Sequence, residues 1–203
     1  LVGERFHTSI NGNLKKLDLE NDFFKPFLER KGKSGDFIGL GKNAEAAVHY
    51  AANTKDPELI ALKEKMIGFI VDHQLPDGYT GFYAPENRLK KAWDLHEMGF
   101  IVQSLMSDWE LFGNKKALEA ARRNVAYVMD RWKTLPDNWE ITWITDRETT
   151  LGFGYGVARL YEATKDEKYR SFLKNERALD SWDDPIVIGR DKMIYGQAYG
   201  YTG

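Results

Sequence analysis

The sequence predicts an all-α protein in which helical hairpins stack side by side, as in a two-layered ring or solenoid. Three observations lead to this fold class. A pattern of helix, tight turn and capped helix occurs three times, with caps at Asp56, Asn114 and Asp166. In each pair, a weakly charged helix is followed by a strongly amphipathic one. The turns within pairs are short, whereas the links between pairs are long.

Seven helices follow from the 3.6-residue spacing of apolar side chains. They span residues 18–31, 39–53, 57–74, 93–112, 115–133, 148–164 and 167–178, and the start of the chain is interpreted as irregular. The Asp or Asn before the second helix of each pair can accept hydrogen bonds from the free N–H groups of its first turn. Pro57 follows one cap at the first helical position, where a missing N–H costs nothing.

The weakly charged helices 39–53, 93–112 and 148–164 are expected to form the inner layer, with the amphipathic helices outside them. Two sets of side chains test this prediction. Deep burial is expected for Ala47, Val48, Ile101 and Leu105, and exposure for Lys63, Lys65, Arg122 and Arg123.

The long links "LPDGYTGFYAPENRLKKA" and "KTLPDNWEITWITDRET" both follow amphipathic helices, so they are expected at one end of the ring. Long irregular loops gathered at one end are a natural place for a binding site. The segment "WDLHEMGF" begins directly after the first link, and it places an aromatic ring, an imidazole and two carboxylates at an inner-helix start.

Composition excludes several classes of protein. The net charge of −2 and the pI near 6.1 show no basic excess, which argues against a nucleic-acid partner. No apolar run approaches the roughly 20 residues needed to cross a bilayer, so no membrane partner is expected. The chain has no cysteine, which excludes disulfides, thiolate nucleophiles and Cys-based zinc sites within these residues. The first residues lack the features of a signal peptide, and the compartment and the oligomeric state stay open.

Aromatic residues make up 13% of the chain, and several lie in polar, glycine-rich segments rather than on helical stripes. Sugar rings have C–H faces and hydroxyl edges, so aromatic rings beside carboxylates and amides favour a carbohydrate ligand. His96 and Glu97 can each hold a sugar hydroxyl, and Trp93 can stack on the ring face. The predicted glycone subsite consists of Gln74, Asp77, Tyr79, Trp93, His96, Glu97 and Trp143.

Each candidate also has a structural interpretation. His96 can be a satisfied core histidine and Trp93 a packing anchor. Asp94 can complement the helix dipole, and Asp77 can build the turn before Gly78. A helical zinc motif needs a second histidine four residues away, and that position after His96 is Phe100, so no metal site is predicted. The carboxylates considered for acid–base catalysis are Asp77, Asp94, Glu97, Asp146 and Glu148.

Two motifs carry a resemblance to a known family. "Q-x-x-D-G-Y-x-G" runs from Gln74 to Gly81, and "L-Y-x-x-T-x-D-x-x-Y" runs from Leu160 to Tyr169. Together with "GLGKNAEAAVHYAANTKDPELIALKEKM" and "WDLHEMG", they resemble the β-L-arabinofuranosidase-like glycoside hydrolases over nearly the whole chain. The resemblance implies an (α/α)₆ toroid, of which residues 1–203 would be the N-terminal half of the catalytic domain.

The best-known branch of this family uses a cysteine nucleophile held by a zinc site of cysteine and glutamate. The resemblance therefore implies that the catalytic residues and a zinc ion belong to sequence beyond Gly203, and that no cofactor lies within these residues. Glu97 is the one catalytic candidate retained here.

The function expected is that of a glycoside hydrolase acting on a plant or microbial polysaccharide or oligosaccharide, releasing arabinofuranose or a related sugar. One alternative is a sugar epimerase or uronate-processing lyase, since toroids host both. Paired histidines on facing inner helices would favour that chemistry, and only His96 is well placed. The other alternative is a non-catalytic helical-repeat carbohydrate-binding protein, for which short polar loops would be expected.

Overall fold

A computed structural model describes residues 2–33, 35–90, 92–134 and 153–176, and this part of the chain is helical throughout its regular structure. The α-helices are α1 (Val2–Thr8), α2 (Lys25–Glu29), α3 (Leu40–Thr54), α4 (Pro57–Asp72), α5 (Ala92–Phe112), α6 (Lys115–Arg131), α7 (Phe153–Thr164) and α8 (Glu167–Ser171). Within the described residues the only strand-like pairing is an isolated bridge between Gly32 and Tyr83. None of the described helices is long and apolar enough to cross a membrane.

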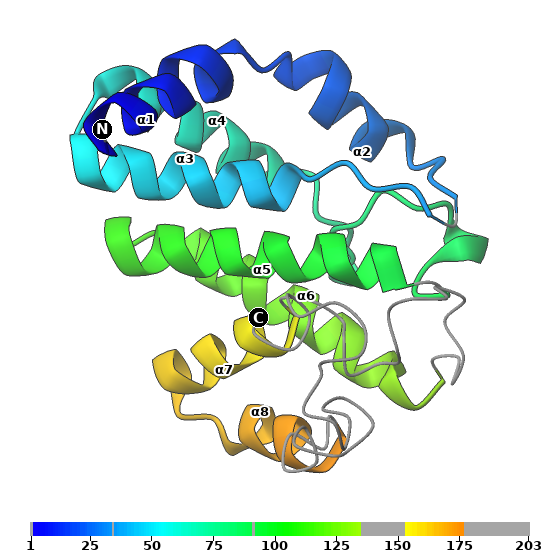
Figure 1. Cartoon of the computed structure of the whole chain (residues 1–203). Helices are drawn as coiled ribbons and strands as arrows, with labels where there is room; N and C mark the ends of the chain where they lie inside the picture. The colour runs from blue at the N-terminus through cyan, green and yellow to red at the C-terminus, as the bar shows by residue number, and fades with distance from the viewer. Residues whose placement is uncertain (1, 34, 91, 135–152, 177–203) are drawn as a thin grey trace, which may run out of the picture.

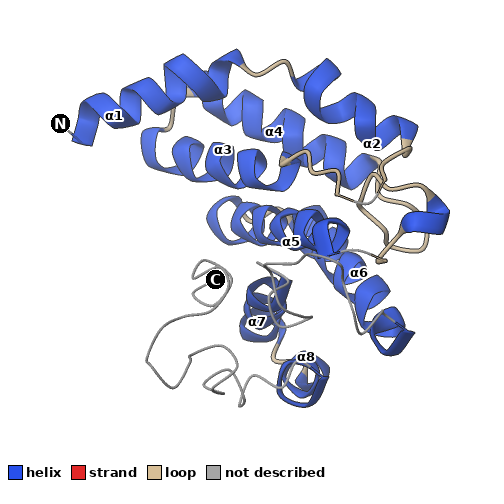
Figure 2. Ribbon diagram, turned by 45° about the vertical axis from the view of Figure 1, so that its right-hand side comes forward, coloured by secondary structure: helices blue, strands red, loops and turns tan. Residues whose placement is uncertain are grey.

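The helices form two layers (Figure 1). Helices α3, α5 and α7 pack side by side as the inner layer. Each of them also packs against the helix that follows it, so α4, α6 and α8 form the outer layer (Figure 2). The hairpins predicted from the sequence are therefore confirmed, in the predicted order.

The three hairpin turns have the same geometry. Asp56 accepts a hydrogen bond from the Glu58 N–H at 2.8 Å, Asn114 from the Lys116 N–H at 3.1 Å, and Asp166 from the Lys168 N–H at 3.1 Å. The residue directly before each cap is left-handed: Lys55, Gly113 and Lys165 have φ values of 57°, 72° and 55°. The caps predicted from the sequence are confirmed.

The burial predicted for the inner layer is also confirmed, because Ala47, Val48, Ile101 and Leu105 have no exposed surface. The exposure predicted for Lys65 and Arg123 is confirmed, whereas Arg122, also predicted to be exposed, is half-buried.

Exposure of Lys63 was a wrong prediction, since this residue is only 5% exposed. It lies on the same stripe of α4 as Leu59, Met66 and Ile70, which face the core. Its ammonium group pairs with the buried Asp108 of α5 at 2.8 Å and lies 4.0 Å from the centre of the Phe112 ring. A buried charge is tolerated only when it is paired in this way.

The first 29 residues differ most from the prediction. The start is helical in α1, and π-helical and 3₁₀ turns (Ser9–Asn13, Leu14–Lys16 and Leu19–Phe24) lead into α2. This segment lies along α4: Lys15 pairs with Asp56 at 2.7 Å, and the Phe24 and Phe69 rings stack with centres 4.0 Å apart. Helix α2 ends at Glu29, because Arg30 is left-handed.

Candidate functional site

The inner helices begin at the same end of the molecule, but α5 reaches further than α3. Gly41, the second residue of α3, touches the backbone of α5 at Phe100 and Ile101, and a Cβ atom there would overlap it. Phe100 is the ninth residue of α5. The first two turns of α5 therefore project beyond the start of α3, between the loops that precede these two helices (Figure 1).

An aromatic and basic group lies on these projecting turns. Trp93, His96 and Phe100 occupy one stripe of α5, and Phe37 and Lys42 join them from the segment before α3 and from its first turn. The His96 ring centre lies 4.9 Å from Phe37, 5.2 Å from Trp93 and 5.0 Å from Phe100. The Lys42 ammonium lies 4.5 Å from the Phe100 ring centre. We call these five residues the mouth cluster.

The mouth cluster is partly open. Phe37, Lys42, Trp93 and Phe100 are half-buried, whereas His96 is 3% exposed. Flat rings with an imidazole and an ammonium group suit a sugar, whose C–H face packs on aromatic rings and whose hydroxyls take hydrogen bonds from the polar groups. Of the predicted subsite, the structure brings Trp93 and His96 together here.

Glu97 adjoins this cluster but faces the backbone. Its carboxylate has no exposed surface and accepts hydrogen bonds from the N–H groups of Ile38, Gly39 and Gly41, at 3.1, 2.6 and 3.1 Å. Burial raises the pKa of Glu97, and these three N–H groups oppose the rise. The structure therefore offers a ligand no surface of the Glu97 side chain, and both of its oxygens already have partners.

Asp94 and Tyr79 are buried together beneath the first turn of α5. The Tyr79 hydroxyl donates to Asp94 at 2.7 Å, and the Leu89 N–H donates to the other carboxylate oxygen at 2.8 Å. Burial raises the pKa of Asp94 to about 7, although both donors favour the ionised form. Tyr79 has no exposed surface either, so its side chain offers no surface for the predicted contact with a sugar.

Two further predicted residues, Gln74 just before the "DGYTGFY" loop and Asp77 within it, hold the loop in place. Gln74 donates to the carbonyl groups of Gly78 and Ala120, both at 2.9 Å, which ties the loop to α6. Asp77 is exposed and accepts from the Tyr79 N–H at 3.1 Å, as its turn-building interpretation requires. Neither contacts the mouth cluster. Trp143, like Asp146 and Glu148, lies outside the described residues.

A second polar group, which was not predicted from the sequence, lies further along the inner helices. Arg159 of α7 donates to both carboxylate oxygens of Glu110, at 3.2 and 2.6 Å, and to the Ser107 hydroxyl at 2.9 Å. Glu45 of α3 accepts from Ser107 at 2.7 Å and bonds His49 at 3.1 Å. We call these five residues the distal network. The available signal was polar residues four apart on a weakly charged helix, Glu45 and His49.

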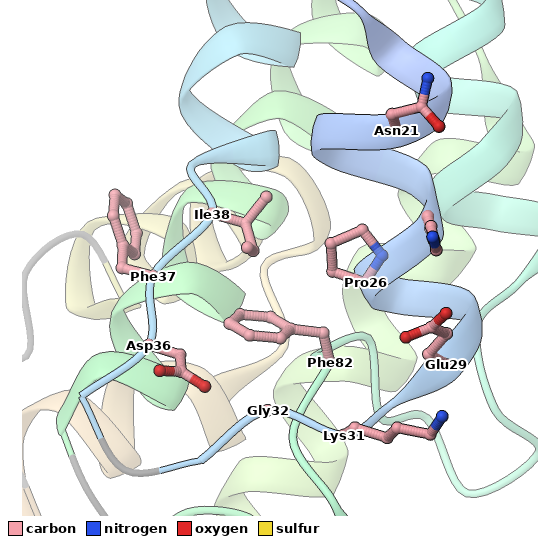
Figure 3. Close-up of a pocket in the computed structure, with 10 residues that line it drawn as sticks. Asn21, Pro26, Glu29, Lys31, Gly32, Asp36, Phe37, Ile38 and Phe82 are labelled. Carbon is pink, nitrogen blue, oxygen red and sulfur yellow. The ribbon is translucent and has the colours of Figure 1, made fainter.

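A surface cavity of about 520 Å³ lies on the other side of the segment before α3. Pro26, Phe37, Ile38 and Phe82 are its apolar lining residues, and Asn21, Lys25, Glu29, Lys31 and Asp36 are among the polar residues that line it. Figure 3 shows Ile38 pointing toward Phe82, while Phe37 points to the opposite side of the backbone. The segment 36–38 is thus a wall shared by the cavity and the mouth cluster.

Within the described residues no group of three or more His, Asp or Glu side chains is placed to hold a metal ion, and the chain has no cysteine. The residues present therefore do not fit the Cys/Glu zinc site that the resemblance implies, and no step of a mechanism is assigned to a metal here.

Comparison with known proteins places this architecture. A family model described as the β-L-arabinofuranosidase GH127 catalytic domain matches residues 29–195. The chain belongs to this GH127 family. No curated protein matches the chain.

Solved structures agree on the fold. A GH127 β-arabinofuranosidase, BT3674, has a TM-score of 0.56 and 15% identity, with 82% of this chain and 30% of that chain covered. The GH127 β-L-arabinofuranosidase Ara127N of Geobacillus stearothermophilus T6 has a TM-score of 0.54 and 18% identity, with 82% and 28% covered. An unsaturated glucuronyl hydrolase of Streptococcus agalactiae has a TM-score of 0.56 and 17% identity, with 97% and 49% covered.

The two layers of helical hairpins are therefore those of an α/α toroid, as the sequence predicted. This GH127 chain spans less than a third of the length of either arabinofuranosidase.

Proposed function

We propose that this chain forms part of a glycoside hydrolase, and that its mouth cluster binds the sugar ring at the non-reducing end of a plant or microbial glycan. The family match over residues 29–195 supports the class of reaction. The placement of Trp93 and His96, together on the projecting turns of α5, supports the location.

In this proposal Trp93 and Phe37 pack on the C–H face of the sugar, while His96 and Lys42 hydrogen-bond its hydroxyls. Both matched enzymes are named as β-arabinofuranosidases, so a terminal β-L-arabinofuranose is the first sugar to test. We propose that residues beyond Gly203 supply the nucleophile and the general acid and bind a zinc ion. Gln74, Asp77 and Tyr79 support the loop behind the sugar, and Trp143 is proposed as a further wall.

The test uses the full-length protein that carries this chain and a panel of p-nitrophenyl glycosides that includes the β-L-arabinofuranoside. Trp93→Ala should lower kcat/KM by about 10- to 100-fold, because it removes a stacking surface. Leu111→Ala, at an exposed position on the same helix, is the control and should leave kcat/KM within about twofold. If the Trp93→Ala variant releases p-nitrophenol as fast as the wild type, the sugar binds elsewhere. No release from any glycoside would contradict the reaction class.

A further inference from the structure

We infer that Glu97 is a positioning residue of the mouth cluster: its carboxylate fixes the start of α3 and the segment before it, and so sets Phe37 against Trp93 and His96. The inference rests on the proposed function for its catalytic consequence. Its geometric part stands on the structure of the described residues.

The start of α3 has no side-chain cap of its own. Its N-cap residue is Gly39, which is left-handed with φ of 82° and has no side chain to accept a hydrogen bond. The free N–H groups at a helix start need acceptors when they are buried, and an unmet buried donor is costly. Glu97 supplies the acceptor from α5, because one oxygen takes the Ile38 and Gly39 N–H groups and the other takes that of Gly41.

The same carboxylate therefore links two parts of the mouth cluster. Glu97 follows His96 directly and lies one helical turn after Trp93. On the other side of the contact, Ile38 follows Phe37, which lies 5.7 Å from Trp93 and 4.9 Å from His96 between ring centres. A shift of segment 38–41 would move the Phe37 ring relative to both.

The contact also needs the close approach of the two helices. A Cβ atom at Gly41 would overlap the α5 backbone, so glycine lets the N–H of residue 41 reach the carboxylate. The wall formed by residues 36–38 is otherwise thin, since the surface cavity lies on its other side (Figure 3). Glu97 thus ties this wall and the start of α3 to α5 through hydrogen bonds.

Glu97→Gln is the direct test. The amide can keep one acceptor oxygen, but its NH₂ group then meets a backbone N–H, so at least one of the three hydrogen bonds is lost. Amide exchange measured by NMR without substrate should show Ile38, Gly39 and Gly41 protected in the wild type, and exchange should be at least about tenfold faster in the variant. Equal exchange rates for these amides in both proteins would overturn the inference.

The functional readout is a double-mutant cycle on the full-length enzyme with its active glycoside. Glu97→Gln and Phe37→Ala should each lower kcat/KM about tenfold, chiefly through KM, because a misplaced ring weakens binding. The double variant should lose no more than about threefold beyond either single variant, since both changes remove the same contact. Losses that multiply would show that Glu97 does not act through Phe37.

Asp108→Asn is the matched control, because Asp108 is an equally buried carboxylate of α5 far along the helix. It should lower Tm while leaving kcat/KM within about twofold and leaving exchange at Gly39 and Gly41 unchanged. If Asp108→Asn lowered kcat/KM as much as Glu97→Gln, the effect of Glu97→Gln would be one of general stability and not of positioning. If the wild type hydrolyses no glycoside, the proposed function fails, and the amide exchange alone decides whether Glu97 positions the segment.

Discussion

At the mouth end of α5, the buried carboxylates Asp94 and Glu97 accept hydrogen bonds from backbone N–H groups and a tyrosine hydroxyl. Toward the other end, Asp108 and Glu110 face Lys63 and Arg159. Within the described residues, the two mouth carboxylates have no ion-pair partner, whereas the distal ones do.

This difference separates two uses of a charge inside a protein. Paired charges such as Lys63 and Asp108 compensate each other's loss of water and join α4 to α5. Carboxylates held by neutral donors keep a raised pKa, because these donors offset only part of the free-energy cost of burial. Such carboxylates are common where function constrains a site. We therefore interpret the distal end of the inner face as structural and the mouth end as the binding end.

Removing the cation at the distal end should have the largest effect on stability. Lys63→Met leaves Asp108 buried with only the Asn114 amide beside it, at 2.7 Å. The free energy of unfolding should fall by about 3–5 kcal/mol in urea titrations. Lys65→Met is the control on the same helix: its pair with Glu20 is also 2.8 Å long but exposed, so the loss should be below about 1 kcal/mol. Equal losses would mean that burial does not distinguish the two pairs.

The pH dependence of stability should report Asp94 at the mouth. The folded state keeps the Asp94 proton up to a pKa of about 7, whereas the unfolded chain releases it near 3.8. The folded state therefore binds more protons between these values, and the free energy of unfolding should fall as pH rises from 4 to 7, by up to about 4 kcal/mol.

The measurement is urea unfolding at several pH values in the wild type and in Asp94→Asn, which has no proton to lose. The wild-type curve should fall relative to that of the variant as pH rises from 4 to 7. Parallel curves would show that Asp94 is ionised throughout, held so by Tyr79 and Leu89.

A smaller effect is expected from crowding the Tyr79–Asp94 contact. A Cβ atom at Gly81 would overlap the Tyr79 hydroxyl, so Gly81→Ala should cost about 1–3 kcal/mol of unfolding free energy. Gly68→Ala in α4 is the control, because nothing lies within 4 Å of its Cβ position. It should stabilise the protein by about 0.5–1 kcal/mol, since alanine is the better helix former. A neutral Gly81→Ala would mean that the loop moves freely away from α5.

Local signals were enough to predict much of the fold. The caps Asp56, Asn114 and Asp166 act on the residues next to them, so their sequence is sufficient to place them. The charge of Lys63 was misleading, because its position on α4 faces the core and its partner Asp108 is distant in sequence. The helical start was missed because π-helical turns such as Ser9–Asn13 break the 3.6-residue spacing of apolar residues.

The candidate site was found in part for the same reason. Trp93 and His96 share a stripe of one helix, so "WDLHEMGF" was sufficient to pair them. The partners of Glu97 are backbone groups some 56 to 59 positions earlier in the chain, and no side-chain pattern marks them. Arg159 bonds Glu110 across two helices, which again only the packing shows.

The two histidines of the inner face test the central claim most directly, because His96 lies in the mouth cluster and His49 in the distal network. His96→Ala and His49→Ala would be made in the full-length protein and kcat/KM measured on its active glycoside. We expect His96→Ala to lower kcat/KM by about 100-fold or more and His49→Ala to change it by less than about threefold. Equal losses, or a larger loss at His49, would contradict the assignment of binding to the mouth end.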